Sequence, residues 1–108
     1  MSQRRVVEYL EGEVSHFGRW FNELDYQAAA KVAMAVYRLE QGHSSNIKSV
    51  GKGVSEYKID FGPGYRIYFG QEGNSLIMLL GGGAKKTQQK DIENAQRLWT
   101  QYKTSKRK

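Results

Sequence analysis

The spacing of the apolar residues changes near Gly42, from a helical period before it to a strand period after it. Before Gly42 the sequence predicts two amphipathic helices, which begin after the favourable N-cap residues Ser15 and Asp25. Gly42 itself stands where a glycine commonly ends a helix. The two apolar stripes are Phe17, Trp20, Phe21 and Leu24, and then Ala28, Val32, Ala35, Val36 and Leu39.

After Gly42 the sequence predicts three consecutive strands over residues 54–61, 65–69 and 76–80, separated by glycine-containing turns. The third strand is apolar at every position, which is typical of a central strand covered on both faces. A strand over residues 4–10 and a helix from about Thr87 complete the series. The predicted order is therefore strand, helix, helix, three antiparallel strands, helix.

These elements predict an α+β fold, with a curved antiparallel sheet of about four strands, an N-terminal helical pair and a C-terminal helix. Each amphipathic stripe needs an apolar partner, and a sheet backed by helices supplies one. The 108 residues have room for one domain, which we place at residues 1–102. Residues 103–108 are expected to form a frayed basic tail.

Several classes of protein and site do not fit the composition. The chain has no cysteine, so disulfides and thiolate metal sites are excluded, and a cytoplasmic location is expected. The longest apolar run is strand-sized, and Glu11 and Glu13 interrupt the N-terminal stretch, so neither a membrane span nor a signal peptide is predicted. His16 and His43 are isolated, and we predict no metal site and no cofactor.

The positive charge lies in one half of the chain. Residues 1–50 carry six Lys or Arg and six Asp or Glu, whereas residues 51–108 carry eleven and five, so the whole excess of +6 lies there. An excess confined to one half indicates a basic face, for which nucleic acid is a usual partner. The alternative is a solubilising surface with a basic tail, because residues 103–108 supply four of these charges.

Three motifs occur in order in the second half: Glu56 to Ile59, Gly64 to Phe69 and Gly82 to Ile92. They read Glu-Tyr-Lys-Ile, Gly-Tyr-Arg-Ile-Tyr-Phe and Gly-Gly-x-Lys-x-x-Gln-x-x-Asp-Ile. Together with the helical first half, they resemble the HigB-like, phage-derived addiction module killer branch of the RelE/ParE superfamily. The resemblance covers nearly the whole chain and implies a RelE-like fold.

The resemblance implies the toxin of a type II toxin–antitoxin module. Most members are ribosome-dependent endoribonucleases that cleave mRNA, whereas those of the ParE branch inhibit DNA gyrase, and the shared fold does not choose between them. It implies as partners the ribosome, mRNA and a cognate antitoxin, often a helix-turn-helix protein encoded beside the toxin. A third possibility is an inactive derivative that only binds nucleic acid.

RNA cleavage without a metal needs a base for the 2′-hydroxyl, positive charge on the phosphorane and an acid for the leaving oxygen. Clustered lysine and arginine side chains can fill these roles. By the resemblance, Lys58 is the candidate base, Arg66 binds the phosphate, and Lys85 or Lys86 supplies a third charge. The further candidates for nucleic-acid binding are Lys52, Tyr65, Tyr68, Gln88 and Lys90.

Alternative roles remain open for several of these residues. Arg66 can instead pair with Glu56 across the hairpin, and Tyr65 and Tyr68 can be packing residues rather than base-stacking ones. Asp91 is favoured in the first turn of a helix whatever the function. Asp60 stands where a second strand lysine is common, and the last helix has no histidine, which keeps the gyrase alternative open.

Overall fold

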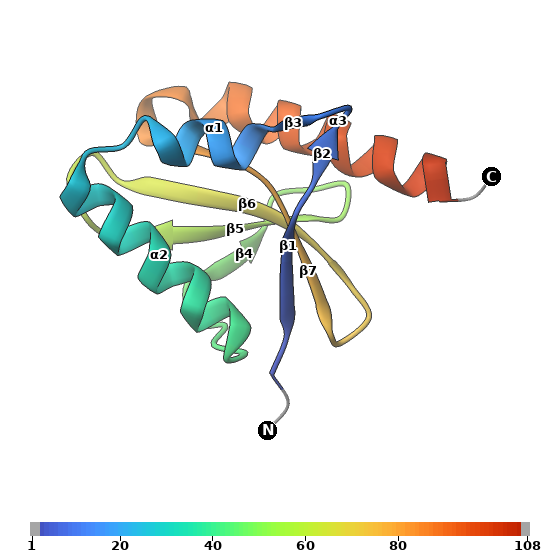
Figure 1. The fold of residues 1–108 in the computed structure, drawn as a ribbon, viewed down its shortest axis with the longest axis horizontal. Coiled ribbons are helices and arrows are strands. Elements are labelled where there is room, and N and C mark those ends of the chain that lie inside the picture. The colour runs from blue at the N-terminus through green and yellow to red at the C-terminus, as the bar shows by residue number, and fades with distance from the viewer. Residues whose placement is uncertain (1–2, 107–108) are drawn as a thin grey trace.

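The computed structural model describes residues 3–106 and places helices on both faces of a five-stranded sheet (Figure 1). The α+β class is therefore confirmed. In chain order the elements are β1 (Arg5–Glu8), β2 (Leu10–Glu11), β3 (Val14–Ser15), α1 (His16–Asn22), α2 (Tyr26–Glu40), β4 (Ile47–Ser49), β5 (Val54–Ile59), β6 (Tyr65–Glu72), β7 (Leu76–Ala84), the 3₁₀ turn η1 (Lys85–Thr87) and α3 (Gln88–Lys106).

The sheet has the strand order β1-β7-β6-β5-β4 and is mixed. The strands β4 to β7 are antiparallel neighbours, but β1 runs parallel to β7, with Arg5 opposite Leu76. The three strands predicted after Gly42 are thus antiparallel as expected, but the sheet has five strands rather than about four, and it is mixed because β1 is parallel. Strand β4 has only three residues between two turn segments, and the direction of β1 depends on a strand at the other end of the chain, so neither has a local signal.

The two N-terminal helices begin after the predicted N-cap residues, and α2 ends just before Gly42. The Ser15 hydroxyl accepts a hydrogen bond from the Gly18 amide at 2.8 Å, and the Asp25 carboxylate accepts one from the Ala28 amide at 2.9 Å. Gly42 follows the last turn of α2 with φ of +84°, a conformation that costs glycine little. Short side-chain caps therefore fix both helices against the sheet.

Alternate residues of each central strand enter two separate apolar cores. In β7, Ile77 and Leu79 face α1 and α2, whereas Met78 and Leu80 face α3, which confirms the expectation of a strand covered on both sides. Trp99 of α3 lies so close to Gly70 that a Cβ at that position would overlap its ring. The first core also contains Phe17, Val32, Ala35, Leu39, Tyr57, Ile59, Ile67 and Phe69, and the second contains Val54, Tyr68, Ala95, Leu98 and Trp99.

Helix α3 continues further than the sequence predicts, through Lys106. The expected frayed tail is therefore wrong for residues 103–106, and residues 107–108 lie outside the described part of the chain. The last turns are held because Tyr102 donates a hydrogen bond of 2.8 Å to Glu72 and Lys106 pairs with the same carboxylate. None of the helices within residues 3–106 is long and apolar enough to cross a bilayer.

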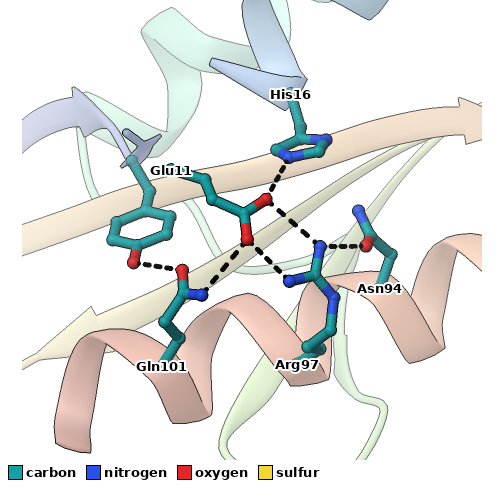
Figure 2. Close-up of polar contacts among 6 residues, drawn as sticks. Glu11, His16, Asn94, Arg97 and Gln101 are labelled. Carbon is teal, nitrogen blue, oxygen red and sulfur yellow. Dashed lines mark hydrogen bonds and ion pairs between the residues drawn. The ribbon is translucent and has the colours of Figure 1, made fainter. Parts of the chain in front are cut away.

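A small hairpin, β2–β3, joins the N-terminal strand to α3 through the Glu11 network, by which we mean Glu11, His16, Asn94, Arg97 and Gln101 (Figure 2). The Glu11 carboxylate accepts hydrogen bonds from Arg97 at 2.7 and 3.3 Å, and from Gln101 at 3.1 Å. The His16 ring lies 2.8 Å from the same carboxylate. These hydrogen bonds lower the pKa of Glu11 to about 2, and the largest contribution comes from Arg97, followed by His16 and Gln101.

Candidate functional site

Lys58 and Arg66 are direct partners in the β5–β6 ladder, so their side chains lie on the same face of the sheet. Both line an open cleft of about 400 Å³, together with Lys48 of the neighbouring strand β4. We call this space the Arg66 cleft. Its lining residues are Ser45, Asn46, Ile47, Lys48, Glu56, Lys58, Asp60 and Arg66, so three cations and two carboxylates meet there.

Arg66 is buried and has two polar neighbours, Gly64 and Glu56. Its Nη1 donates a hydrogen bond of 2.9 Å to the Gly64 carbonyl, and its Nε lies 3.6 Å from Oε1 of the buried Glu56. Gln88, at the start of α3, donates a hydrogen bond of 2.9 Å to the same Glu56 oxygen. The pairing of Arg66 with Glu56 is thus observed, and it coexists with the position of Arg66 in the wall of the cleft.

The ion pair between Arg66 and Glu56 leaves a hydrogen-bond donor unused. A separation of 3.6 Å is too long for a hydrogen bond, and within residues 3–106 the Arg66 Nε–H has no acceptor. A buried donor without an acceptor is uncommon and unfavourable. A shift of the guanidinium towards a ligand in the cleft would therefore break no hydrogen bond of that nitrogen.

Lys58 is held much more loosely than Arg66. Its side chain is 52% exposed, and its Nζ lies 3.8 Å from an Asp60 carboxylate that is itself almost fully exposed. The backbone around it is fixed, because the Lys58 amide donates to the Asn46 carbonyl at 3.1 Å. Lys58 also borders a second, smaller cleft of about 220 Å³ that Lys31 and Arg38 of α2 line.

Tyr68 lies near Arg66 on the face of the sheet that α3 covers, and Asp91 approaches it from the first turn of α3. Tyr68 is fully buried, and its hydroxyl has no hydrogen-bond partner within the described residues. Burial, and then the nearby carboxylates of Glu56 and Asp91, raise the pKa of Tyr68, so the phenol stays protonated. Burial likewise raises the pKa of Asp91, against a 2.6 Å hydrogen bond from Thr87. Tyr68 therefore offers no exposed ring for a base.

The other candidate residues lie at different distances from the cleft. Lys85 lies beside Gly64, at the same end of the sheet as Arg66, whereas Lys86 is exposed in the η1 turn and Lys90 in the first turn of α3. Tyr65 lies on the opposite face, where it packs against Trp20 with a centroid distance of 6.2 Å. Lys52 lies in the turn before β5, beside the middle of α3, and thus at the far end of that strand. The structure consequently brings Lys58, Arg66 and Lys85 to one end of the sheet.

Two residues of the cleft were missed because they belong to the unpredicted strand β4 and its approach. Lys48 lines the cleft, and the Asn46 side-chain amide donates a hydrogen bond of 3.3 Å to the Lys58 carbonyl. They carry no clear signal in the sequence, since Ile47-Lys48-Ser49 is a short run with one apolar residue between two turn clusters. Within residues 3–106, no group of three or more His, Asp or Glu side chains is placed to hold a metal ion.

The arrangement can bind an anion and place it near several basic side chains. Arg66 supplies a positioned guanidinium, and Lys48 and Lys58 supply mobile ammonium groups on adjacent strands. Glu56 and Asp60 offset part of this charge, so the cleft is less basic than its lysine and arginine content indicates. A phosphodiester is a ligand of suitable charge and size for such a site.

Comparison with known proteins places the chain in a family. No solved structure matches it. A protein of Haemophilus influenzae described as "Uncharacterized protein" is 42% identical over 83 residues, which are 76% of this chain and 84% of that protein. Residues 19–100 match the family "Phage derived protein Gp49-like (DUF891)", a span that holds the end of α1, all of α2, the cleft and most of α3. The chain therefore belongs to the Gp49-like family of phage-derived proteins, a toxin-like family of the addiction-module type.

Proposed function

We propose that this protein is the toxin of a type II toxin–antitoxin module and that it cleaves mRNA on translating ribosomes. The family supports the toxin role. One observation supports the nuclease role above the others: three cations from three adjacent strands, Lys48, Lys58 and Arg66, line one open cleft. The RelE-like fold and the cytoplasmic site of action belong to the same proposal.

In this proposal the cleft holds the scissile phosphate and cleavage needs no metal ion. Arg66 binds the phosphate, because it lines the cleft and because Glu56 and Gly64 hold its guanidinium in position. Lys58 is the candidate base for the 2′-hydroxyl, because it faces the cleft directly opposite Arg66. Lys85 or Lys86 approaches the leaving oxygen from the η1 turn, and Lys48 binds a neighbouring phosphate.

The remaining candidate residues contact the ribosome-bound RNA outside the cleft. Lys90 and Gln88 lie in the first turn of α3, beside the η1 turn, where a strand of RNA leaving the cleft would pass. Such contacts with phosphates are screened by salt, so binding of the protein to ribosomes should weaken steeply as ionic strength rises. The cognate antitoxin is the partner that keeps this activity in check.

A different target is favoured by the carboxylates in the cleft. Glu56 faces Arg66 and Asp60 faces Lys58, so each central cation has an acidic neighbour, and no histidine lines the cleft. A protein with this cleft can poison DNA gyrase without any nuclease chemistry, as the ParE-like alternative requires. A derivative that only binds nucleic acid would show neither effect.

The test is expression of the wild type and the Lys58→Ala, Arg66→Ala double variant from a tightly controlled promoter. Growth arrest with new mRNA ends that depend on translation, absent in the double variant, supports the nuclease. Arrest with intact mRNA and a DNA-damage response supports gyrase instead, and absence of arrest removes the toxin role. Lys103→Ala is the matched control, because it removes an exposed cation near Glu72, at the opposite end of β6 from Arg66.

A further inference from the structure

Helix α2 has a second apolar stripe, which faces away from the sheet. The buried side consists of Ala28, Val32, Ala35 and Leu39, as expected for a helix that packs on a core. The outer side is also apolar, and its large residues are strongly exposed: Tyr26 is 87%, Met34 50% and Tyr37 55% exposed. The outer stripe consists of Tyr26, Ala30, Ala33, Met34 and Tyr37. A helix that is apolar on both sides normally has a partner on each.

A groove continues the outer stripe towards the edge of the sheet. It has a volume of about 340 Å³ and begins at Ala33, which belongs to both the stripe and the groove. Its floor is apolar and is formed mainly by side chains of α1, α2 and the sheet edge strand β1. These three elements are labelled in Figure 1. The lining residues are Val6, Val7, Glu8, Phe17, Phe21, Ala33, Val36, Glu40 and Leu79. The small side chains of Ala30 and Ala33 let another backbone approach α2 closely.

The charges on the two sides of the stripe differ in sign. Lys31 and Arg38 lie on the side of α2 that borders β5, where both line the smaller cleft next to Lys58. Glu8 and Glu40 lie on the other side, at the rim of the apolar groove. An apolar seam with cations along one edge and carboxylates along the other is complementary to a helix with the reverse arrangement.

A second copy of the chain packed antiparallel fits this surface poorly. If two α2 helices packed antiparallel about a two-fold axis, the same edge of each would meet, and Lys31 of both copies would lie on one side of the interface. Like charges placed there are repulsive, as are Glu8 and Glu40 on the other side. A different protein with opposite charges on its two edges avoids both conflicts.

We propose that the outer face of α2 and the adjoining groove bind an amphipathic helix of the antitoxin, a helix with acidic residues along one edge and basic residues along the other. The acidic edge meets Lys31 and Arg38, the basic edge meets Glu8 and Glu40, and an apolar side chain enters the groove beside Ala33. This inference rests on the proposed toxin function but concerns a surface outside the Arg66 cleft. Because Lys31 and Arg38 border the cleft that Lys58 shares, the bound helix lies beside the site it controls.

The test uses the protein encoded by the adjacent reading frame as the probe, with Ala33→Arg as the variant. Ala33 is exposed, so arginine should leave the fold intact while it blocks the seam and the mouth of the groove. We expect the variant to bind the probe roughly 30-fold or more weakly, as for the loss of a central interface contact. It should also arrest growth as strongly as the wild type and no longer be rescued by co-expression of the probe. Thr100→Arg, on the exposed side of α3, is the matched control and should bind and be rescued normally.

The other outcomes separate the two proposals. If both variants bind the probe as the wild type does, the docking surface lies elsewhere and the proposal is wrong, while the toxin function is untouched. If the wild type does not bind the probe, or if it forms a dimer that Ala33→Arg dissociates, the proposed occupant is wrong. If the wild type arrests no growth but Ala33→Arg still loses the probe, the surface stands and the toxin function fails.

Discussion

Two groups of charged side chains contact α3, and they differ in how completely their charges are paired. In the Glu11 network, the carboxylate accepts hydrogen bonds from Arg97 and Gln101 and lies against His16 (Figure 2). In the Arg66 cleft, Arg66 and Glu56 approach only to 3.6 Å, and Lys58 and Asp60 only to 3.8 Å. The first group resembles a structural clamp, whereas the second retains donors that a ligand can use.

The difference does not follow burial. Glu56 and Arg66 are almost fully buried, yet they make the longer ion pair, while Glu11 and Arg97 are partly exposed and make the shorter one. Burial of an ion pair at imperfect geometry is unfavourable, and a fold keeps it only where other contacts maintain it. Here the Gly64 carbonyl holds Arg66, and Gln88 in the first turn of α3 holds Glu56. The position of the ion pair therefore depends on the first turn of α3.

The largest effect is expected for Arg66→Ala, which removes a wall of the cleft and leaves Glu56 buried without its cation. Loss of one partner of a buried pair costs about 3 kcal/mol or more, and mRNA cleavage should disappear. Urea unfolding and primer extension measure the two effects. In the double variant Arg66→Met, Glu56→Leu, stability should largely return while cleavage does not. A loss of less than about 0.5 kcal/mol in Arg66→Ala would show that the pair is not buried as described.

Lys58→Ala should separate activity from stability. Lys58 is exposed and weakly paired, so its loss should change the free energy of unfolding by no more than about 0.5 kcal/mol. Cleavage of a reporter mRNA should fall by about 100-fold or more if Lys58 is the base. Lys58→Arg is informative here, because arginine keeps the positive charge but cannot lose its proton. Full activity of Lys58→Arg would assign the residue a purely electrostatic role.

Arg97→Ala should do the opposite of Lys58→Ala. It removes two of the hydrogen bonds that tie the β2–β3 hairpin to α3, and thermal unfolding should occur about 2–4 °C lower. Growth arrest and cleavage should not change, since Arg97 does not line the Arg66 cleft. A clear loss of cleavage in a folded Arg97→Ala variant would contradict the separation of the two groups.

The smallest effect concerns the pH dependence of the Glu11 network. The pKa of Glu11 is about 2 in the folded protein, below its ordinary value of 4.5, so the carboxylate stabilises the fold above pH 4.5. This contribution is lost as the pH falls from 4.5 towards 2. The melting temperatures of wild type and Glu11→Gln should therefore differ at neutral pH and converge near pH 2. Glu13→Gln, on the same hairpin, should follow the wild type throughout, and a constant difference for Glu11→Gln would refute the shift.

The features that the sequence predicts well are those fixed by neighbouring residues. The caps at Ser15 and Asp25 and the glycine after α2 each act within a few positions, and the structure has all three. The alternation in β7 likewise reports its two covered faces directly. Local patterns of this kind do not depend on where the chain returns later.

The features that the sequence did not predict depend on distant contacts. Tyr65 and Tyr68 alternate on one strand, which suggested that one of them is exposed, but α1 covers one face and α3 the other, so both are packed. Glu56 is charged and reads as a surface residue, yet the first turn of α3 covers it. Lys48 joins the cleft only because β4 pairs with β5. Each of these outcomes is set by tertiary packing, which overrides the local pattern.

The parallel pairing of β1 with β7 has a consequence for how the protein is made. Strand β1 leaves the ribosome first, but its partner lies at Leu76 to Leu79, so the sheet cannot close until most of the chain has been synthesised. The hairpin of β5 and β6, which carries Lys58 and Arg66, needs only a short loop and can form earlier. Strands β5 and β6 can thus pair before β1 has a partner in the sheet. We expect the nascent chain to become protease-resistant only after β7 emerges, late in its synthesis.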